Sequence, residues 1–270
     1  MSFSVISLAA VVVAITPLEA SAAQDYKEER NATVDAKGAT AVEIVGRAGW
    51  LRVRGVAGLT EVRVRGTART SEEDWLDEIK LVAERRGNVV VVEARMPNRH
   101  CTGLCIGNWH QSLDLEIEVP KGIAARVEDS SGEVEIFDVG ELDLDDSSGD
   151  IELENIGGRV RVHDSSGEIR MRHITGDIEI EDNSGDIVVR DVTGSVLVDD
   201  DSSGEIDITR VSGTVHVRDD GSGSIDVRDI GGDFIVDHDG SGDISHSGVK
   251  GKVDVPQRKQ RRSSRSHDDW

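Results

Sequence analysis

The chain has 270 residues, with 31 lysines and arginines against 53 aspartates and glutamates, and a formal net charge of -22. This excess of negative charge argues against nucleic acid or an anionic membrane surface as the main partner, because both carry negative charge themselves. Aromatic residues make up only 3% of the chain, so we expect a core of aliphatic side chains. Glycine is abundant but follows no Gly-X-Y period, which excludes collagen.

The N-terminus has the pattern of a secretory signal peptide. Residues 5–18 are apolar and uncharged, and Ala20, Ser21 and Ala22 then offer the small side chains of a cleavage site. We predict a signal peptide over residues 1–22. The alternative, a membrane anchor, is disfavoured because the apolar segment is short for a bilayer span. We therefore expect a periplasmic, cell-surface or secreted protein without a membrane span in the mature chain.

Residues 23–120 are predicted to form a divergent coil and a capping insert. Gly49–Gly58 alternates in the phase of the repeats that follow it, and we expect Glu61–Arg65 to continue this first coil. Ser71 and Asp74 resemble a capping box, which predicts a short helix near Ser71–Asp77.

The second half of this insert is predicted to be made of strands. Ile79–Glu84 and Val89–Arg95 alternate on either side of a glycine turn, which predicts a hairpin. Leu113–Val119 is predicted to be a further strand, ended by Pro120. An atypical terminal unit of this kind is what a repeat array needs to cover its core.

Cys101 and Cys105 are the only cysteines in the chain. In an oxidising compartment we expect them to form a disulfide that closes a small loop. His100 and His110 flank them, so a zinc site is the alternative, because zinc binds thiolates and imidazoles. The spacing is not a strong zinc signature, and we favour the disulfide.

A seven-fold repeat fills residues 121–255. The turn Asp-x-Ser-Gly recurs at spacings of 17, 18, 18, 19, 19 and 19 residues. Two alternating segments fill each period, and 34 of the 35 positions that face inward are apolar, with His246 as the exception. Equivalent residues at a constant period stack on one another in a solenoid, whereas a meander needs no such period. The sequence therefore predicts an all-β fold, a parallel β-solenoid of about seven to eight coils.

The aspartates of these turns form a column with two open interpretations. In the structural one, each carboxylate accepts hydrogen bonds from backbone N–H groups of its own turn. In the other, the crowded acidic groups form a weak cation ladder, because Ca²⁺ prefers oxygen ligands. The spacing matches neither an EF-hand nor the nine-residue calcium repeat, so we expect no dedicated cofactor and at most weak Ca²⁺ binding. The column consists of Asp129, Asp146, Asp164, Asp182, Asp201, Asp220 and Asp239.

Catalytic residues are not indicated, because the turns of the array are short and build no cleft in which acidic groups converge. Aromatic side chains, which commonly bind sugars, are concentrated before the array at Trp50, Trp75 and Trp109. We expect Trp50 and Trp75 to pack in the core of the cap, and we place any specific recognition site in this N-terminal part. Residues 256–270 are polar and basic, which predicts a disordered tail.

Several of these motifs together resemble the bacterial "putative adhesin" family. They are the Asp-Ser-Ser-Gly turns, the segment Glu118–Gly122, the early coil Gly49–Gly58 and the signal peptide, and the resemblance covers about residues 42–255. It implies an exported β-solenoid of unknown function, without catalytic or binding residues to carry over. We expect a non-catalytic, adhesin-like interaction or scaffold protein whose envelope partner is a protein or a glycan. The alternatives are a β-helix enzyme acting on polysaccharide and an envelope-stress accessory protein.

Overall fold

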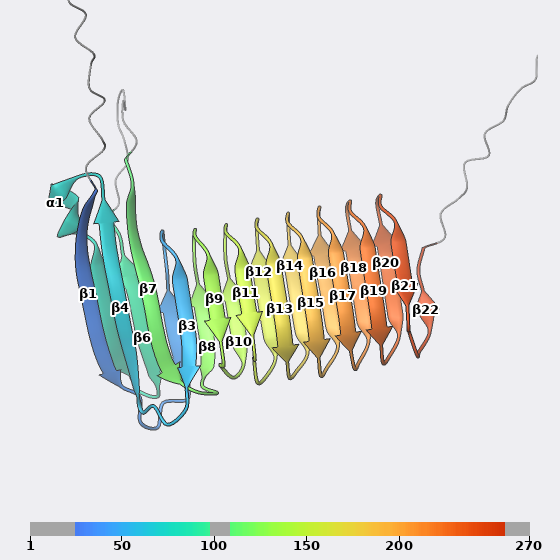
Figure 1. Cartoon of the computed structure of the whole chain (residues 1–270), viewed down its shortest axis with the longest axis horizontal. Coiled ribbons are helices and arrows are strands. Elements are labelled where there is room, and N and C mark those ends of the chain that lie inside the picture. The colour runs from blue at the N-terminus through green and yellow to red at the C-terminus, as the bar shows by residue number, and fades with distance from the viewer. Residues whose placement is uncertain (1–24, 98–108, 257–270) are drawn as a thin grey trace, which may run out of the picture.

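The computed structural model describes residues 25–97 and 109–256, and these form an all-β parallel β-solenoid of about seven turns (Figure 1). The predicted fold class is confirmed. Two sheets of eleven strands each run along the whole rod, one on either side of the core.

Each repeat contributes one strand to each sheet. After the glycine of the Asp-x-Ser-Gly turn the chain enters the first sheet, and after a second turn it returns through the other sheet. The strands of the first sheet are β9 (Val134–Phe137), β11 (Ile151–Glu154), β13 (Ile169–Ile174), β15 (Ile187–Val192), β17 (Ile206–Val211), β19 (Ile225–Ile230) and β21 (Ile244–Ser247). Those of the second sheet are β8 (Ala124–Glu128), β10 (Leu142–Asp145), β12 (Val160–Asp164), β14 (Ile178–Asp182), β16 (Val196–Asp201), β18 (Val215–Asp220), β20 (Phe234–Asp239) and β22 (Val253–Asp254).

Successive coils pair in parallel with equivalent residues in register, as the constant period requires. Ile151, for example, aligns with Val134 on one side and Ile169 on the other. The register between β14 and β16 shifts once, between Ile180 and Glu181. This shift accommodates the change from an 18-residue to a 19-residue period, because a longer coil must place one extra residue outside the ladder.

The predicted inward side chains form the core, except in the last coil. From Val134 to Val236 they are at most 4% exposed. In the last coil His246 is exposed, Val253 is 40% exposed and Ile244 is only partly buried, so the expected burial is wrong there. The reason is that no further described coil stacks on β21 and β22.

The N-terminal part extends both sheets with partly antiparallel strands. These are β1 (Tyr26–Asp35), β2 (Ala41–Val45), β3 (Leu51–Val56), β4 (Glu61–Thr70), β5 (Lys80–Arg86), β6 (Val89–Arg95) and β7 (Gln111–Pro120). β3 stacks in parallel on β9, which confirms the repeat phase of Gly49–Gly58. β4 pairs antiparallel with β1 and β7, so the prediction that Glu61–Arg65 continues the first coil is wrong. After the antiparallel β4 and β5, β6 and β7 stack in parallel on β2 and β3, and β8 and β9 stack on the opposite edges of the same two strands.

The other predicted elements of this part are present with small changes. β5 and β6 form the expected antiparallel hairpin, and β7 contains the expected strand. The helix α1 is shorter than predicted and spans Glu73–Leu76. Its N-cap is Glu72, without a side-chain capping bond, so the predicted capping box is wrong. Among the described residues, no helix is long and apolar enough to cross a membrane.

Candidate functional site

The Asp-x-Ser-Gly turns stack into one corner of the solenoid, and their aspartates are buried there. Asp164 Oδ1 accepts hydrogen bonds from the backbone N–H groups of Ser165 at 2.7 Å and Ser166 at 3.2 Å. The same arrangement recurs in the turn of Asp146. One carboxylate oxygen therefore has the role that the structural interpretation gave it. Buried aspartates are Asp129, Asp146, Asp164, Asp182, Asp201 and Asp220, whereas Asp239 near the open end is partly exposed.

The second carboxylate oxygen of these aspartates lacks a hydrogen-bond donor. Oδ2 of Asp146, Asp164, Asp182 and Asp201 is buried without a protein partner. Burial, followed by the charge of the neighbouring aspartate, raises the pKa of Asp201 to about 7, and burial raises that of Asp164 to about 6. An isolated buried charge is costly, so protonation is how such a column lowers its energy. Asp164 and Asp201 therefore bind protons at a higher pH than an exposed aspartate does.

The cation ladder and the cysteine site remain predictions. In residues 25–97 and 109–256, no group of three or more His, Cys, Asp or Glu side chains is placed to hold a metal ion. Weak Ca²⁺ binding would have to use the exposed acids beside the column, such as Glu181 and Asp200, which are aligned in adjacent strands. His110 contacts Asp25 at 3.2 Å, while His100, Cys101 and Cys105 lie outside the described residues.

The opposite corner of the solenoid carries a column of residues in left-handed backbone conformation. One such residue precedes the buried apolar residue of each second turn, with φ between 57° and 61°. In the last coil, Gly248 has a similar conformation with φ of 67°. The non-glycine members, which we call the left-handed column, are Asp138, Asn155, His173, Asp191, Arg210 and Asp229.

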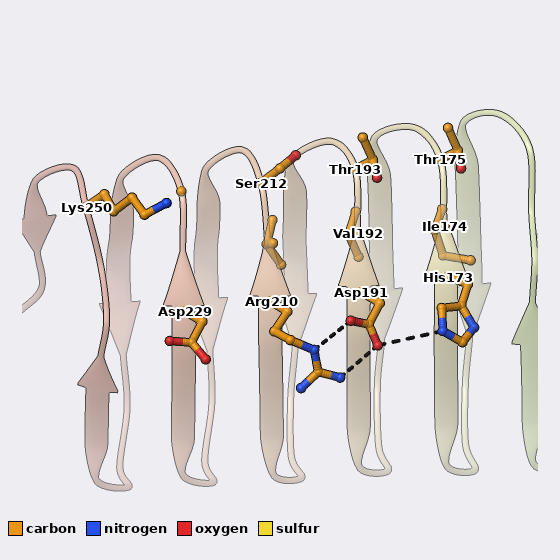
Figure 2. Close-up of a pocket in the computed structure, with 12 residues that line it drawn as sticks. His173, Ile174, Thr175, Asp191, Val192, Thr193, Arg210, Ser212, Asp229 and Lys250 are labelled. Carbon is orange, nitrogen blue, oxygen red and sulfur yellow. Dashed lines mark hydrogen bonds and ion pairs between the residues drawn. The ribbon is translucent and has the colours of Figure 1, made fainter.

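A groove of about 690 Å³ runs along this corner across the last coils of the array. Figure 2 shows that His173, Asp191, Arg210, Asp229 and Lys250 follow one another along it, so acidic side chains alternate with basic ones and histidine. Its other polar lining is a row of hydroxyls on Thr175, Thr193 and Ser212. We call this feature the edge groove. No single residue type marks it in the sequence, because the members of the left-handed column include aspartate, asparagine, histidine and arginine.

Ion pairs connect neighbouring coils within the edge groove. Arg210 binds both carboxylate oxygens of Asp191, at 2.6 and 2.7 Å, and His173 lies 3.9 Å from the same carboxylate (Figure 2). The hydrogen bond from Arg210 holds the pKa of Asp191 below its ordinary value. The acids with raised pKa lie at the other corner, separated from the groove by strands of six residues, or about 20 Å. The groove thus offers fixed charges and hydroxyls for contact.

Trp50 is 41% exposed, so the expectation that it packs in the cap core is wrong. It occupies the position after the turn glycine, where the next coil has Glu133. Its side chain lies between two hollows of about 480 and 180 Å³ on the outer face of the first sheet. The guanidinium of Arg52, which lines only the smaller hollow, lies 5.9 Å from the indole centroid. Trp75 is half-buried and meets Trp109 edge-on, with 5.9 Å between ring centroids.

Comparison with known families identifies the chain. The sequence profile of the Toastrack DUF4097 family matches residues 75–267, so the protein belongs to this family. No curated protein matches the chain.

Similar solved structures come from several bacteria. A protein of Bacteroides fragilis named a "putative adhesin" matches with 13% identity and a TM-score of 0.50, over 86% of this chain and 97% of its own. A protein of Parabacteroides distasonis named a "putative lipid binding protein" matches with 16% identity and a TM-score of 0.42, over 84% and 96%. At 13% identity the likeness to the Bacteroides fragilis protein shows the fold alone.

Proposed function

We propose that this member of the Toastrack DUF4097 family is an exported, non-catalytic interaction protein of the bacterial envelope or surface, with an adhesin-like or scaffold role. The observation that carries the proposal is the left-handed column beside the edge groove. A left-handed conformation costs a non-glycine residue about 1 kcal/mol or more, although Asn and Asp tolerate it better than others. Glycine, as at Gly248, adopts this conformation without strain. The other positions of the column carry side chains despite the cost, and we expect these side chains to contact a partner.

The edge groove suits an extended partner better than a compact one. It presents alternating charges and hydroxyls from successive coils, which repeat at the strand spacing of about 4.8 Å. A polysaccharide chain or an extended protein segment could place polar groups against several coils at once. This agrees with a glycan or protein of the envelope as the partner.

A binding experiment with matched variants tests this assignment. Purified protein is incubated with a panel of insoluble polysaccharides and with peptidoglycan, and retention and product release are both measured. We expect Arg210→Ala and Asp191→Ala to reduce retention. The control is Arg161→Ala with Glu179→Ala, which removes another exposed pair between coils, 3.2 Å long, away from the groove. Equal retention by both sets would contradict the groove assignment, and turnover abolished by one carboxylate change would establish the polysaccharide enzyme instead.

Trp50 favours a second candidate function, recognition of a sugar ring at the N-terminal part. An exposed indole can stack on the apolar C–H face of a pyranose, and nearby carboxylates and guanidinium groups can bind its hydroxyls. The larger hollow beside Trp50 supplies Asn31, Arg65, Thr67 and Glu116 as such groups.

Fluorescence titration tests the sugar site. We expect cellotetraose or chitotetraose, whose β-linked rings expose apolar faces, to change the tryptophan emission of the wild-type protein. Trp50→Ala should abolish this response and Trp109→Ala, which removes another exposed indole, should preserve it. A response that survives Trp50→Ala would exclude this site.

Export is proposed from the N-terminal sequence. Mass spectrometry of the protein recovered from its native host tests it, since cleavage after Ala22 or Ala23 leaves a defined mature N-terminus. An intact N-terminus on a cytoplasmic protein would overturn this part of the proposal.

A further inference from the structure

The two ends of the described solenoid differ in how they are covered. At the N-terminal end, antiparallel strands close both sheets, with β1 and β5 outermost and in contact with each other. At the other end the sheets stop at β21 and β22 (Figure 1). Within residues 25–97 and 109–256, no strand pairs with the outward edge of either one. Unpaired strand edges are templates for pairing with another chain.

This open end also exposes apolar side chains of the last coil. Val253 is 40% exposed, and Ile244, Val249 and Val255 are only partly buried although they follow the inward phase. Any strand that pairs with β21 and β22 would cover them in the same way as each coil covers the one before it. The open end therefore combines unpaired strand edges with apolar core side chains that are incompletely covered.

The charge of the last coil differs from that of the rest of the array. Residues 242–256 contain Asp243 and Asp254 against Lys250 and Lys252, so two negative and two positive charges sum to zero. Residues 223–241 contain five aspartates and one arginine, a net of -4, and the five earlier periods carry between -2 and -7. Two copies of this protein repel each other along their sides, and the last coil is the part of the array where this repulsion vanishes.

We propose that the open end binds the open end of a second copy, with β21 pairing antiparallel to β21 of the second copy and β22 to its β22. The interface would be isologous, with a two-fold axis normal to the sheets. Both sheets would then continue from one copy into the other.

The arrangement of charge around the last coil selects this two-fold axis. Lys250 and Lys252 lie in the turn after β21, whereas Asp239 and Asp243 lie at the other end of the strands. Antiparallel pairing of each strand with its own counterpart brings the lysine turn of one copy against the aspartate end of the other. The alternative axis, which pairs β21 with β22, would bring the two lysine turns together.

The size of the interface sets the expected strength of the dimer. Each copy would contribute one coil to the interface, which is fewer than the about 20–30 residues that each partner contributes to an interface of standard size. We therefore expect reversible dimerisation with a dissociation constant on the order of micromolar. The segment 257–270 is the competing occupant, but its net charge of +3, from five basic and two acidic residues, matches the lysine turn poorly.

Sedimentation velocity of the mature chain over a wide range of concentrations tests the proposal. We expect a monomer–dimer equilibrium, and small-angle scattering of the dimer should show a rod of nearly twice the monomer length. Val253→Asp should raise the dissociation constant at least about tenfold, because it places charge in the interface without disturbing a buried residue of the monomer. The control is Leu197→Asp, the same kind of change on an outward, partly exposed position of β16.

Each other outcome overturns the proposal. A monomer at all concentrations, or a dimer whose length equals that of the monomer, excludes end-to-end pairing. A chain ending at Pro256 separates the two occupants: if only this truncated chain dimerises, residues 257–270 cover the end themselves. Equal weakening by Val253→Asp and Leu197→Asp would place the contact elsewhere.

Discussion

Positions in this fold differ sharply in the substitutions that they tolerate, because each coil stacks directly on its neighbours. The turn glycines show this most clearly. Gly185 has φ of 147°, and a Cβ there would lie 1.7 Å from the carbonyl oxygen of Gly167 in the coil below. Gly157 has no such constraint, since a Cβ would lie 3.5 Å from its nearest atom. Glycine is therefore required at Gly185 by backbone contact and is replaceable at Gly157.

We expect Gly185→Ala to destabilise the protein by more than about 1 kcal/mol, because the backbone of two coils must separate. Gly157→Ala should change the free energy of unfolding by less than about 0.5 kcal/mol. Urea denaturation measures both. Equal midpoints for the two variants would contradict the stacked-glycine geometry.

Adjacent residues of one strand give an equally sharp contrast. Ile187 is fully buried in β15, whereas its neighbour Val188 faces outward and is partly exposed. Ile187→Asp should cost more than about 4 kcal/mol or prevent folding, because it buries a charge without a partner. Val188→Asp introduces the same group on the outer face, and we expect a loss below about 1 kcal/mol in thermal unfolding. A larger loss of stability for Val188→Asp than for Ile187→Asp would mean that Val188 faces the core and Ile187 faces solvent.

At the scale of the element, the buried aspartate column couples the solenoid to pH. The pKa of Asp129 is raised to about 7 and that of Asp182 to about 6, chiefly by burial, against an unfolded value of 3.8. Between these values the folded protein holds more protons than the unfolded chain, so the free energy of unfolding falls as pH rises. The stabilisation is complete below about pH 4 and is lost as pH rises through about 6 to 7.

We therefore expect the melting temperature to fall from pH 5 to pH 8. Asp182→Asn keeps an acceptor for the turn N–H groups but cannot ionise, so it should flatten this dependence and be more stable than the wild type at pH 8. Differential scanning calorimetry at several pH values tests both statements. A melting temperature that rises towards pH 8 would contradict the protonated column.

The period of the repeats was enough to predict the coils of the array, but not the burial and protonation of their turn aspartates. Constant spacing and the inward apolar set determine the coils, because stacked positions must match. Burial of Asp164 could not be predicted, since aspartate in a turn is usually exposed and only the coil above covers it. β1 was missed for the opposite reason: it is an outermost strand with mostly exposed side chains, so it lacks an apolar face to detect. The edge groove was missed because backbone conformation, not residue type, defines it.

At the scale of the whole molecule, charge is the dominant feature. The net charge is -22, so acidic groups repel one another along the rod. Salt at physiological concentration screens this repulsion over about 8 Å. Exposed acids of adjacent coils, such as Glu181 and Asp200, lie side by side in the second sheet. Cations that bind the folded array better than the unfolded chain must stabilise it by linkage.

We expect millimolar Ca²⁺ to raise the melting temperature more than Na⁺ of the same ionic strength. Asp200→Asn should reduce this difference, whereas Asp77→Asn, which removes a carboxylate outside the array, should not. Equal melting temperatures in Ca²⁺ and matched Na⁺ would leave the acidic turns with a purely structural role.

The parallel stacking has a mechanical consequence. The described chain begins at the N-terminal cap and ends at the open coil, so a pull on its two ends acts along the rod (Figure 1). The hydrogen bonds between strands point in that same direction, and such a load breaks them one coil at a time instead of shearing a whole sheet. Each coil of 17 to 19 residues would release about 60 Å of chain length. Tethered at both ends, the protein would behave as an extensible spring that yields stepwise under low tension.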